Sequence, residues 1–124
     1  MLTDDEIEAG KRRTKYTDDP HHEHNDCIRL AYEWLDAQKT IKSSRKDWHA
    51  LKHIIEKWAG RYVSQTDVEV AAELHPRIAG KYPNYNLSGK LTRPNDRRLA
   101  DISEAMTQGQ RDRIDEEVYS IVEP

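Results

Sequence analysis

The hydrophobic positions of this chain recur mostly at the spacing of amphipathic helices. Over residues 24–40, Ile28, Ala31 and Leu35 lie three or four residues apart, which is the period of one helix face. The Asn-Asp pair at positions 25–26 offers a side chain that can cap the helix start. We therefore expect the first firm helix over residues 24–40.

A second amphipathic stretch follows, and it ends at a glycine. Its apolar positions recur at intervals of three, four and three residues and comprise Trp48, Leu51, Ile55 and Trp58. Ser43 or Ser44 can start this helix, with Asp47 three residues after Ser44 as the acid of a capping box. Gly60 is expected to end it, because glycine readily adopts the left-handed conformation that closes many helices.

A third helix is expected over residues 64–74. Ser64 and Asp67 have the spacing of a capping box at its start. The helix should stop at His75-Pro76, because the residue before a proline is pushed out of helical geometry. Its inward positions are Val68, Ala71 and Ala72.

Past the proline stop the helical signals weaken. Residues 85–91 can form a short helix that Gly89 weakens, and a further helix is expected to start at residues 94–96. The inward positions of this last helix are Leu99, Ile102 and Met106. No alternation of apolar and polar residues typical of a strand stands out. The sequence therefore predicts an all-α fold, a small helical domain of four to five helices.

The two ends of the chain are predicted to be loosely ordered. In residues 1–22, blocks of acidic and basic residues occur with few apolar ones, a composition that cannot offset the entropy of ordering; a short helix over residues 3–9 can form there. Residues 109–124 form an acidic tail, and such tails often cover a basic surface. The carboxylates of this tail are Asp112, Asp115, Glu116, Glu117 and Glu123. The helical domain then spans residues 23–108.

The composition narrows the class of protein. The chain has 124 residues, of which 35% are charged and 35% hydrophobic, which fits one domain with a small core. It has no Phe and a single cysteine, Cys27, so no internal disulfide can form. The acidic start of the chain is unlike a signal peptide, and no run of about 18 apolar residues occurs. We expect a cytoplasmic protein without a membrane span, and the small core favours a homodimer or docking onto a partner.

Positive charge is concentrated in residues 77–98, here called the basic segment, although the whole chain has a net charge of −3. Six basic residues accompany one acid, so the segment carries +5 and the remainder −8. The basic residues, which can contact phosphates, are Arg77, Lys81, Lys90, Arg93, Arg97 and Arg98. Side chains that can contact or stack on nucleobases are Asn84, Tyr85, Asn86 and Ser88. The basic segment is therefore a candidate DNA-binding surface.

The order of elements up to residue 91 is loosely that of a helix-turn-helix, in which the second helix enters the major groove. Residues 85–91 would be that reading helix. The connection from residue 74 is far longer than the usual turn of three to four residues. An alternative therefore stays open, in which Leu87 and Leu91 belong to the core and the charges are solvated.

Patterns for catalysis or metal binding are weak. The histidines within residues 21–24 are adjacent, and adjacent helical positions do not face one ion. His49 and His53 share a helix face, but no cysteine or HExxH pattern accompanies them. Cys27 is expected to fill space in the core. We expect no enzymatic activity, no cofactor and no metal.

Two stretches of the chain carry a resemblance to known proteins, residues 24–38 (HNDCIRLAYEWLDAQ) and residues 53–65 (HIIEKWAGRYVSQ). Together they resemble small, mostly uncharacterised accessory proteins of temperate phages of enteric bacteria, over about residues 20–108. The resemblance implies a protein that acts by binding, on DNA or on a host enzyme, to redirect expression or block defence.

The resulting hypothesis is a phage-type regulatory factor that binds nucleic acid, most simply DNA, through the basic segment. The alternative is an inhibitor or adaptor that binds a host enzyme or defence complex. For that alternative an exposed Trp34, Trp48 or Trp58 would be a natural anchor, because tryptophan is enriched at the energetic centres of protein interfaces.

Overall fold

The computed structural model describes residues 1–44 and 51–124. Within these ranges the chain forms four α-helices, α1 (Asp4–Arg13), α2 (Asn25–Asp36), α3 (Leu51–Ala59) and α4 (Gln65–Leu74). Four short strands make two separate sheets: β1 (Gly80–Lys81) pairs antiparallel with β2 (Asn84–Tyr85), and β3 (Leu91–Arg93) pairs parallel with β4 (Tyr119–Val122). The last third also contains the 3-10 helices η1 (Asp96–Leu99), η2 (Gly109–Arg113) and η3 (Glu116–Val118).

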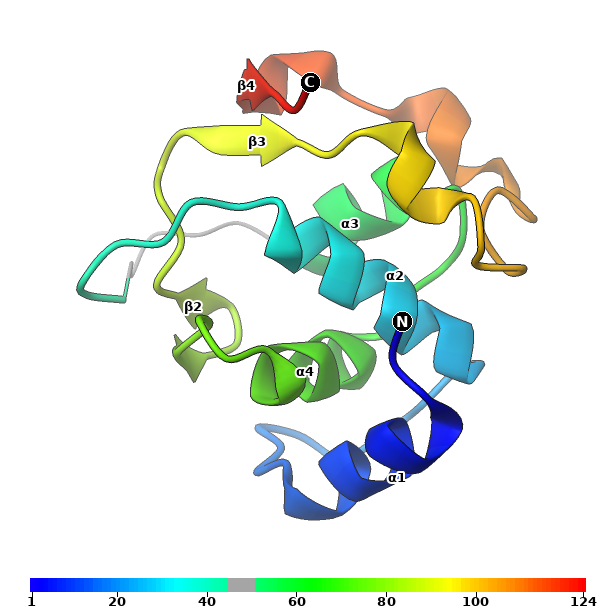
Figure 1. Cartoon of the computed structure of the whole chain (residues 1–124), viewed down its shortest axis with the longest axis vertical. Coiled ribbons are helices and arrows are strands. Elements are labelled where there is room, and N and C mark those ends of the chain that lie inside the picture. Colours follow the sequence, from blue (N-terminus) through cyan, green and yellow to red (C-terminus); the bar gives the residue numbers. More distant parts are fainter. Residues whose placement is uncertain (45–50) are drawn as a thin grey trace.

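The elements are stacked along the long axis of the molecule (Figure 1). The order runs from α1 at one end through α4 and α2 to β3 and β4 at the other end. The β1–β2 hairpin lies beside α4. Helix α4 contacts both α1 and α2, so it is covered on two sides.

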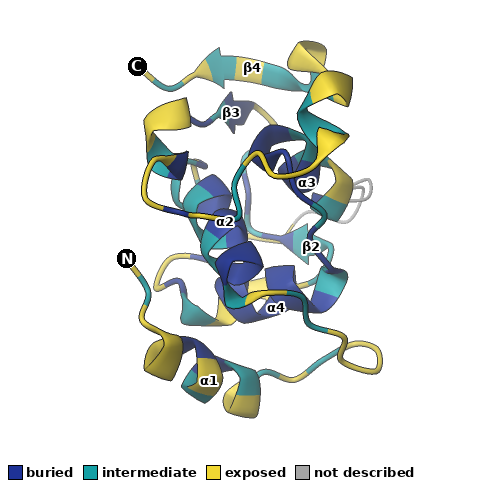
Figure 2. Cartoon of the chain, turned by 90° about the vertical axis from the view of Figure 1, so that its right-hand side faces the viewer, coloured by how far each residue is buried: buried dark blue, intermediate teal, exposed yellow. Residues whose placement is uncertain are grey.

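The core gathers between α2, α3 and α4, whose inner faces are buried (Figure 2). Trp34 and Trp58 are completely buried in it. The Trp34 Nε1–H donates to the Tyr119 hydroxyl at 3.0 Å, and the Trp58 Nε1–H donates to the Pro94 carbonyl at 3.2 Å. Neither indole is therefore exposed as an interface anchor. Trp48 lies outside the described residues, and so do the predicted capping acid Asp47 and His49.

Three helices form where the apolar pattern placed them. Helix α2 begins at Asn25, one residue after the expected start, and His24 rather than Asn25 or Asp26 caps it, since His24 Nδ1 accepts from the Asp26 N–H at 2.9 Å. It ends at Asp36, four residues earlier than expected. The capping box of α4 is confirmed, since Ser64 Oγ accepts from the Asp67 N–H at 3.1 Å and Asp67 Oδ2 accepts from the Ser64 N–H at 3.3 Å. Helix α3 ends at Ala59, directly before Gly60, which has the expected positive φ of 66°.

The prediction of an all-α domain is wrong, because the chain between α4 and the C-terminus forms strands and 3-10 helices. In place of the reading helix expected at residues 85–91, Tyr85 ends β2, Leu87 forms a bridge with Thr40, and Leu91 starts β3. The helix-turn-helix interpretation therefore fails. Each strand has only two to four residues, which is too short to leave an alternation in the sequence, and β3 and β4 pair although they lie far apart along the chain.

The prediction of a helix starting at residues 94–96 is also wrong, because only the short 3-10 helix η1 forms there. Leu99 and Ile102 are buried as predicted, but Met106 is 43% exposed and has a left-handed φ of 61°. The Met106 N–H instead donates to the Ala59 carbonyl at 2.9 Å. This loop therefore closes the C-terminal end of α3 rather than continuing a helix.

The two ends of the chain pack against the domain. Helix α1 has a capping box between Thr3 and Glu6, and its Ile7 is completely buried. The C-terminal segment, residues 109–124, contributes β4 but has no buried residue. It is attached by backbone pairing with β3, by polar side chains, and by Ile114 and Tyr119, which pack partly buried against the core.

Candidate functional site

Carboxylates of the same chain hold several arginines of the basic segment. Arg77 Nη2 lies 3.2 Å from Asp36 Oδ1 at the end of α2. Arg93 Nε lies 2.8 Å from Glu116 Oε2, and Arg93 Nη1 lies 3.2 Å from Asp96 Oδ1. These guanidinium groups are therefore engaged within the molecule.

Arg98 is the most heavily engaged of the predicted phosphate-binding residues. Its Nε and Nη2 each donate to one oxygen of Glu123 at 2.7 Å. Its Nη1 donates to Glu33 Oε1 and to Asp36 Oδ2, both at 2.9 Å. The hydrogen bonds to Glu123 are the largest cause of the raised pKa of Arg98. Part of the acidic tail thus covers part of the basic segment.

The remaining cations, Lys81, Lys90 and Arg97, are exposed and have no carboxylate partner among the described residues. They are spread along the molecule. The hairpin that carries Lys81 lies beside α4, whereas β3 and the following turn lie on the other side of α2 (Figure 1). The structure does not gather the six basic residues into one patch.

The predicted nucleobase contacts are largely used inside the fold. Asn86 accepts from the Ala79 N–H at 2.8 Å and donates to the Arg77 carbonyl at 3.0 Å, which closes the hairpin loop. Ser88 Oγ accepts from the Lys90 N–H at 3.2 Å. Tyr85 is only 3% exposed, and Asn84 is half-buried in β2. DNA binding by these residues stays a prediction.

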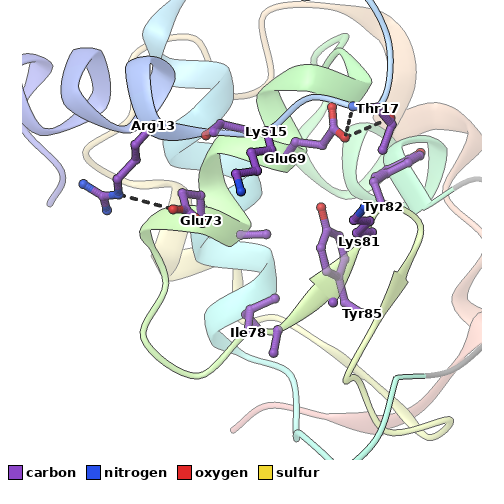
Figure 3. Close-up of a pocket in the computed structure, with 13 residues that line it drawn as sticks. Arg13, Lys15, Thr17, Glu69, Glu73, Ile78, Lys81, Tyr82 and Tyr85 are labelled. Carbon is purple, nitrogen blue, oxygen red and sulfur yellow. Dashed lines mark hydrogen bonds and ion pairs between the residues drawn. The ribbon is translucent and has the colours of Figure 1, made fainter.

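A pocket of about 360 Å³ with both polar and apolar lining lies at the start of the basic segment (Figure 3). Its walls come from three segments: residues 13–17 at and after the end of α1, residues 69–73 of α4, and residues 78–85 at the hairpin. We call it the Glu69 pocket. Two of the predicted site residues, Lys81 and Tyr85, line it.

The hairpin wall depends on a glycine. Gly80 has a φ of 111°, which non-glycine residues rarely adopt. A Cβ atom at this position would lie 2.6 Å from the Asn84 carbonyl oxygen and 2.8 Å from Ser44 Oγ. The chain can therefore turn back as β2 and bring Tyr82 and Tyr85 to the pocket only with glycine here.

The segment after α1 is tied onto α4 by a chain of hydrogen bonds. His22 Nδ1 lies 2.9 Å from Asp67 Oδ1, and His22 Nε2 lies 2.9 Å from the Tyr16 hydroxyl. Asp67 is completely buried. Because Tyr16 lies between Lys15 and Thr17, this network places both neighbours at the pocket.

Glu69 is a buried acidic residue in the wall of the pocket. It is only 5% exposed, although glutamate is almost never fully buried unless it is paired. Its Oε1 accepts from the Thr17 N–H at 3.2 Å and from the Thr17 hydroxyl at 2.9 Å. Its Oε2 is buried and has no hydrogen-bond partner among the described residues. The Glu69 side chain therefore lines the pocket, while its Oε2 is itself closed to solvent.

Two tyrosines supply the aromatic part of the wall. Burial, and then the negative charge of Glu69, raise the pKa of Tyr85, so its hydroxyl stays a neutral group that can donate a hydrogen bond. Burial also raises the pKa of Tyr82, whose hydroxyl accepts from the Lys52 N–H at 3.2 Å. The two rings meet edge to face, with centroids 6.3 Å apart.

The charged side chains leave the pocket with an excess of one positive charge. Arg13 Nε lies 3.3 Å from Glu73 Oε1, so these two cancel. Lys15 and Lys81 are exposed, and neither has a carboxylate partner among the described residues. Figure 3 shows Lys15, Lys81 and Glu69 reaching the pocket from three different segments. Two positive charges thus accompany the single negative charge of Glu69.

The other reactive side chains do not form a competing site. Burial raises the pKa of the Cys27 thiol to about 12, so the nucleophilic thiolate is rare at neutral pH. Among the described residues, no group of three or more His, Cys, Asp or Glu side chains could hold a metal ion.

Sequence reasoning missed Lys15, Thr17 and Glu69 because they come from segments outside the basic segment. One signal was present in the sequence. Glu69 is the single acid within the dense run Val68 to Ala72, and a helix that is apolar on all sides is usually buried. An acid in such a helix is a candidate for a buried, functional carboxylate.

Comparison with known protein families, with curated proteins and with solved structures found no match to this chain. The resemblance to phage accessory proteins therefore stays a prediction. Among the described residues, no helix combines the length and the apolar character that crossing a bilayer requires.

Proposed function

We propose that the protein is a binding protein for a small charged ligand, which it takes up in the Glu69 pocket. The observation that carries this proposal is a pocket of about 360 Å³ lined by Lys15 and Lys81, which are exposed and have no carboxylate partner among the described residues. The buried carboxylate of Glu69 is the only other charge among the described residues of this lining that the Arg13–Glu73 pair does not cancel. An anionic ligand would compensate the excess positive charge when it binds.

The size and polarity of the cavity support the same proposal. Its volume lies near the lower end of the roughly 300–1,000 Å³ typical of ligand pockets. Lys15 and Lys81 favour an anionic group on the ligand, while Glu69 favours a hydrogen-bond donor or a cation. The pocket therefore suits a small molecule with both kinds of group better than an apolar one.

Thermal shift measurements with a defined panel test the proposal. The panel contains glycine, L-glutamate, glutarate, inorganic phosphate and AMP. A ligand present at 100 times its Kd should raise the free energy of unfolding by about 2.7 kcal/mol. Calorimetric titration then measures the Kd of each probe that shifts the transition.

Variants of lysines separate the pocket from general effects of charge. Lys15→Met and Lys81→Met should each weaken binding of an anionic probe, because each removes one positive charge from the lining. Lys90→Met is the matched control, since Lys90 is equally exposed and lies outside the pocket. Absence of any shift across the panel, or equal binding by wild type and both pocket variants, would contradict the proposal.

DNA binding through the basic segment can be tested separately. Internal ion pairs leave Lys81, Lys90 and Arg97 as its cations without a carboxylate partner among the described residues. With about three phosphates neutralised, log K should fall against log[salt] with a slope of about −2.7. A much steeper slope would mean that the internal ion pairs open on binding.

A further inference from the structure

Two loops cross at one edge of the molecule and are joined by backbone hydrogen bonds. They are residues 39–44, which come after α2, and residues 86–90, which come after β2. The Ser88 N–H donates to the Lys39 carbonyl at 2.8 Å. We call this region the loop crossing. In Figure 1 it lies at the left edge of the molecule, whereas η1 and η2 lie at the right.

The pairing of the two loops turns Lys39 outward. Thr40 forms a bridge with Leu87, which is completely buried, so this pair faces the core. The side chains on either side of a bridged residue point to the opposite face. Lys39 and Ile41 are accordingly exposed, Ile41 by 38%. The fold therefore fixes Lys39 on the outer face of the crossing.

Three lysines of the loop crossing carry charge that the neighbouring chain does not offset. Lys39, Lys42 and Lys90 are exposed, and none has a carboxylate partner among the described residues. The chain has 23 acids in 124 residues, yet none occurs in residues 37–44 or 78–95. The crossing therefore presents three positive charges, and these two ranges supply no negative charge.

The acid closest to Lys39 along the chain is already paired with other residues. Asp36 Oδ1 lies 2.8 Å from His75 Nε2, and Asp36 Oδ2 accepts from Arg98 Nη1 at 2.9 Å. An anion that binds at the crossing therefore does not have to displace this carboxylate.

The composition of the loop crossing suits phosphates better than a protein surface. Protein interfaces are depleted in lysine and are centred on buried aromatic or apolar residues. The one large apolar side chain exposed in the described part of the crossing is Ile41. Lysine ammonium groups and serine hydroxyls are common donors to phosphate oxygens, and Ser43 and Ser44 are exposed next to Lys42. The partner that this surface fits is a backbone of repeated phosphates.

The loop crossing lacks the groups that read or stack on nucleobases. Single-stranded nucleic acid is held largely by stacking on aromatic rings, but neither loop contains an aromatic residue, and the adjoining Tyr85 is only 3% exposed. The one amide side chain of the two loops, that of Asn86, is bonded to the Ala79 N–H and the Arg77 carbonyl. The contact is therefore with the backbone of a duplex and does not depend on base sequence.

The small extent of the loop crossing favours DNA over double-stranded RNA. Domains that bind double-stranded RNA contact two successive minor grooves and the phosphates between them. Two short loops that cross at one point do not span such a distance. Sequence-independent contact with B-form DNA requires only that cations neutralise phosphates.

From these observations we propose that the loop crossing binds the phosphate backbone of double-stranded DNA through Lys39, Lys42 and Lys90. Binding is independent of base sequence. This inference goes beyond the proposed function, because it assigns a second surface with a different ligand and does not involve the Glu69 pocket. It also differs from DNA binding through the basic segment, since Lys90 is the one residue of that segment that takes part.

Fluorescence anisotropy with the full chain and two labelled DNA duplexes of unrelated sequence tests the inference. Three neutralised phosphates predict that log K falls against log[salt] with a slope of about −2.7. We expect this slope, and the same affinity, for both duplexes. Unlabelled single-stranded DNA, duplex RNA and poly-L-glutamate serve as competitors, and each should compete less well than unlabelled duplex DNA.

Two double variants with the same change in net charge locate the surface. Lys39→Gln/Lys42→Gln should reduce the slope to about −0.9 and weaken binding at least about tenfold at low salt, because two of the three phosphate contacts are lost. Arg97→Gln/Arg113→Gln is the control, since both arginines are exposed in η1 and η2 and have no carboxylate partner among the described residues. The control should keep a slope of about −2.7. Circular dichroism checks that both variants fold, and if one does not, the competitors on wild type decide the matter.

The outcomes separate this surface from the alternatives. Absence of binding to either duplex, or an equal loss of slope in both double variants, would overturn the inference. A loss only in the control would overturn it as well and would return DNA binding to the basic segment, which contains Arg97. Unequal affinity for the two duplexes, or stronger competition by single-stranded DNA or duplex RNA, would also contradict it.

A protein partner and the Glu69 pocket are distinguished by the same measurements. If poly-L-glutamate competes as well as duplex DNA, the surface binds acidic proteins and the inference fails. None of these results affects the Glu69 pocket, because that site is tested with small anions and with Lys15→Met.

Discussion

Removal of the Arg98 guanidinium should detach the C-terminal segment from the rest of the fold. Arg98 donates two hydrogen bonds to Glu123, which follows β4, and one each to Glu33 and Asp36 of α2. Arg98→Met keeps a long apolar side chain but loses all four bonds. Three carboxylates would then lie close together without the cation between them.

The size of the effect follows from the burial of this group. The Arg98 side chain is 20% exposed, and its partners are 23–38% exposed. Exposed ion pairs contribute about 0.2–1 kcal/mol, and breaking a buried pair costs about 3–5 kcal/mol. For this intermediate site, and with Asp36 still bonded to His75, we expect a loss of about 2–3 kcal/mol. For a chain of this length that corresponds to a fall in Tm of about 10 °C.

Thermal unfolding followed by near-UV circular dichroism measures this change. Arg97→Met is the matched control, because it removes the same charge from the adjacent position, where the guanidinium contacts only the Pro124 backbone oxygen at 3.3 Å among the described residues. The control should change the free energy of unfolding by less than about 0.5 kcal/mol. A loss below 1 kcal/mol for Arg98→Met, or equal losses for both variants, would refute the reasoning.

Three further predictions concern pH, backbone conformation and thiol reactivity. The hydrogen bonds from Arg98 lower the pKa of Glu123 below its ordinary 4.5. The ionised carboxylate therefore stabilises the fold fully above pH 4.5, and this stabilisation is lost as the pH falls through the lowered pKa. Over that pH range, hydrogen exchange of the β4 amides should accelerate in wild type, and Arg98→Met should lack this pH-dependent acceleration. Gly60→Ala should cost more than about 2 kcal/mol in denaturant titration, because φ is 66° and the new Cβ would lie 2.9 Å from Met106 Cα; a loss under 1 kcal/mol would contradict this. Cys27 should react with a disulfide reagent at pH 8 at least about a hundred times more slowly in the native state than in denaturant, because burial raises the pKa of its thiol to about 12. Similar rates in the two states would show that the thiol is accessible in the folded protein.

The helices could be predicted because their signals are local. The cap of α4 lies within four residues, and the apolar stripe of α2 repeats every three or four residues. Both features can be identified in a short window of sequence. The expected extension of α2 to residue 40 failed because Thr40 instead pairs with Leu87, 47 residues later, and no local window contains that partner.

The pairing of β3 with β4 and the pocket could not be predicted for the same reason. Leu91 of β3 pairs with Tyr119 of β4 across the whole C-terminal third of the chain. The Glu69 pocket likewise joins Thr17 to a carboxylate 52 positions later. Within its own helix Glu69 is marked only as the single acid of the run Val68 to Ala72, and no local pattern names the distant segment that covers it.

The cluster of positive charge that suggested DNA binding has a structural explanation in this fold. In the C-terminal segment no residue is fully buried, and Ile114 and Tyr119 pack partly buried against the core. Ion pairs and backbone bonds add to this attachment, with Arg93 holding Glu116 and Arg98 holding Glu123. A basic stretch in a chain with an acidic tail is therefore better interpreted first as a source of intramolecular ion pairs. The cations without a carboxylate partner, such as Lys15 and Lys81 at the pocket, are better candidates for contacting a ligand.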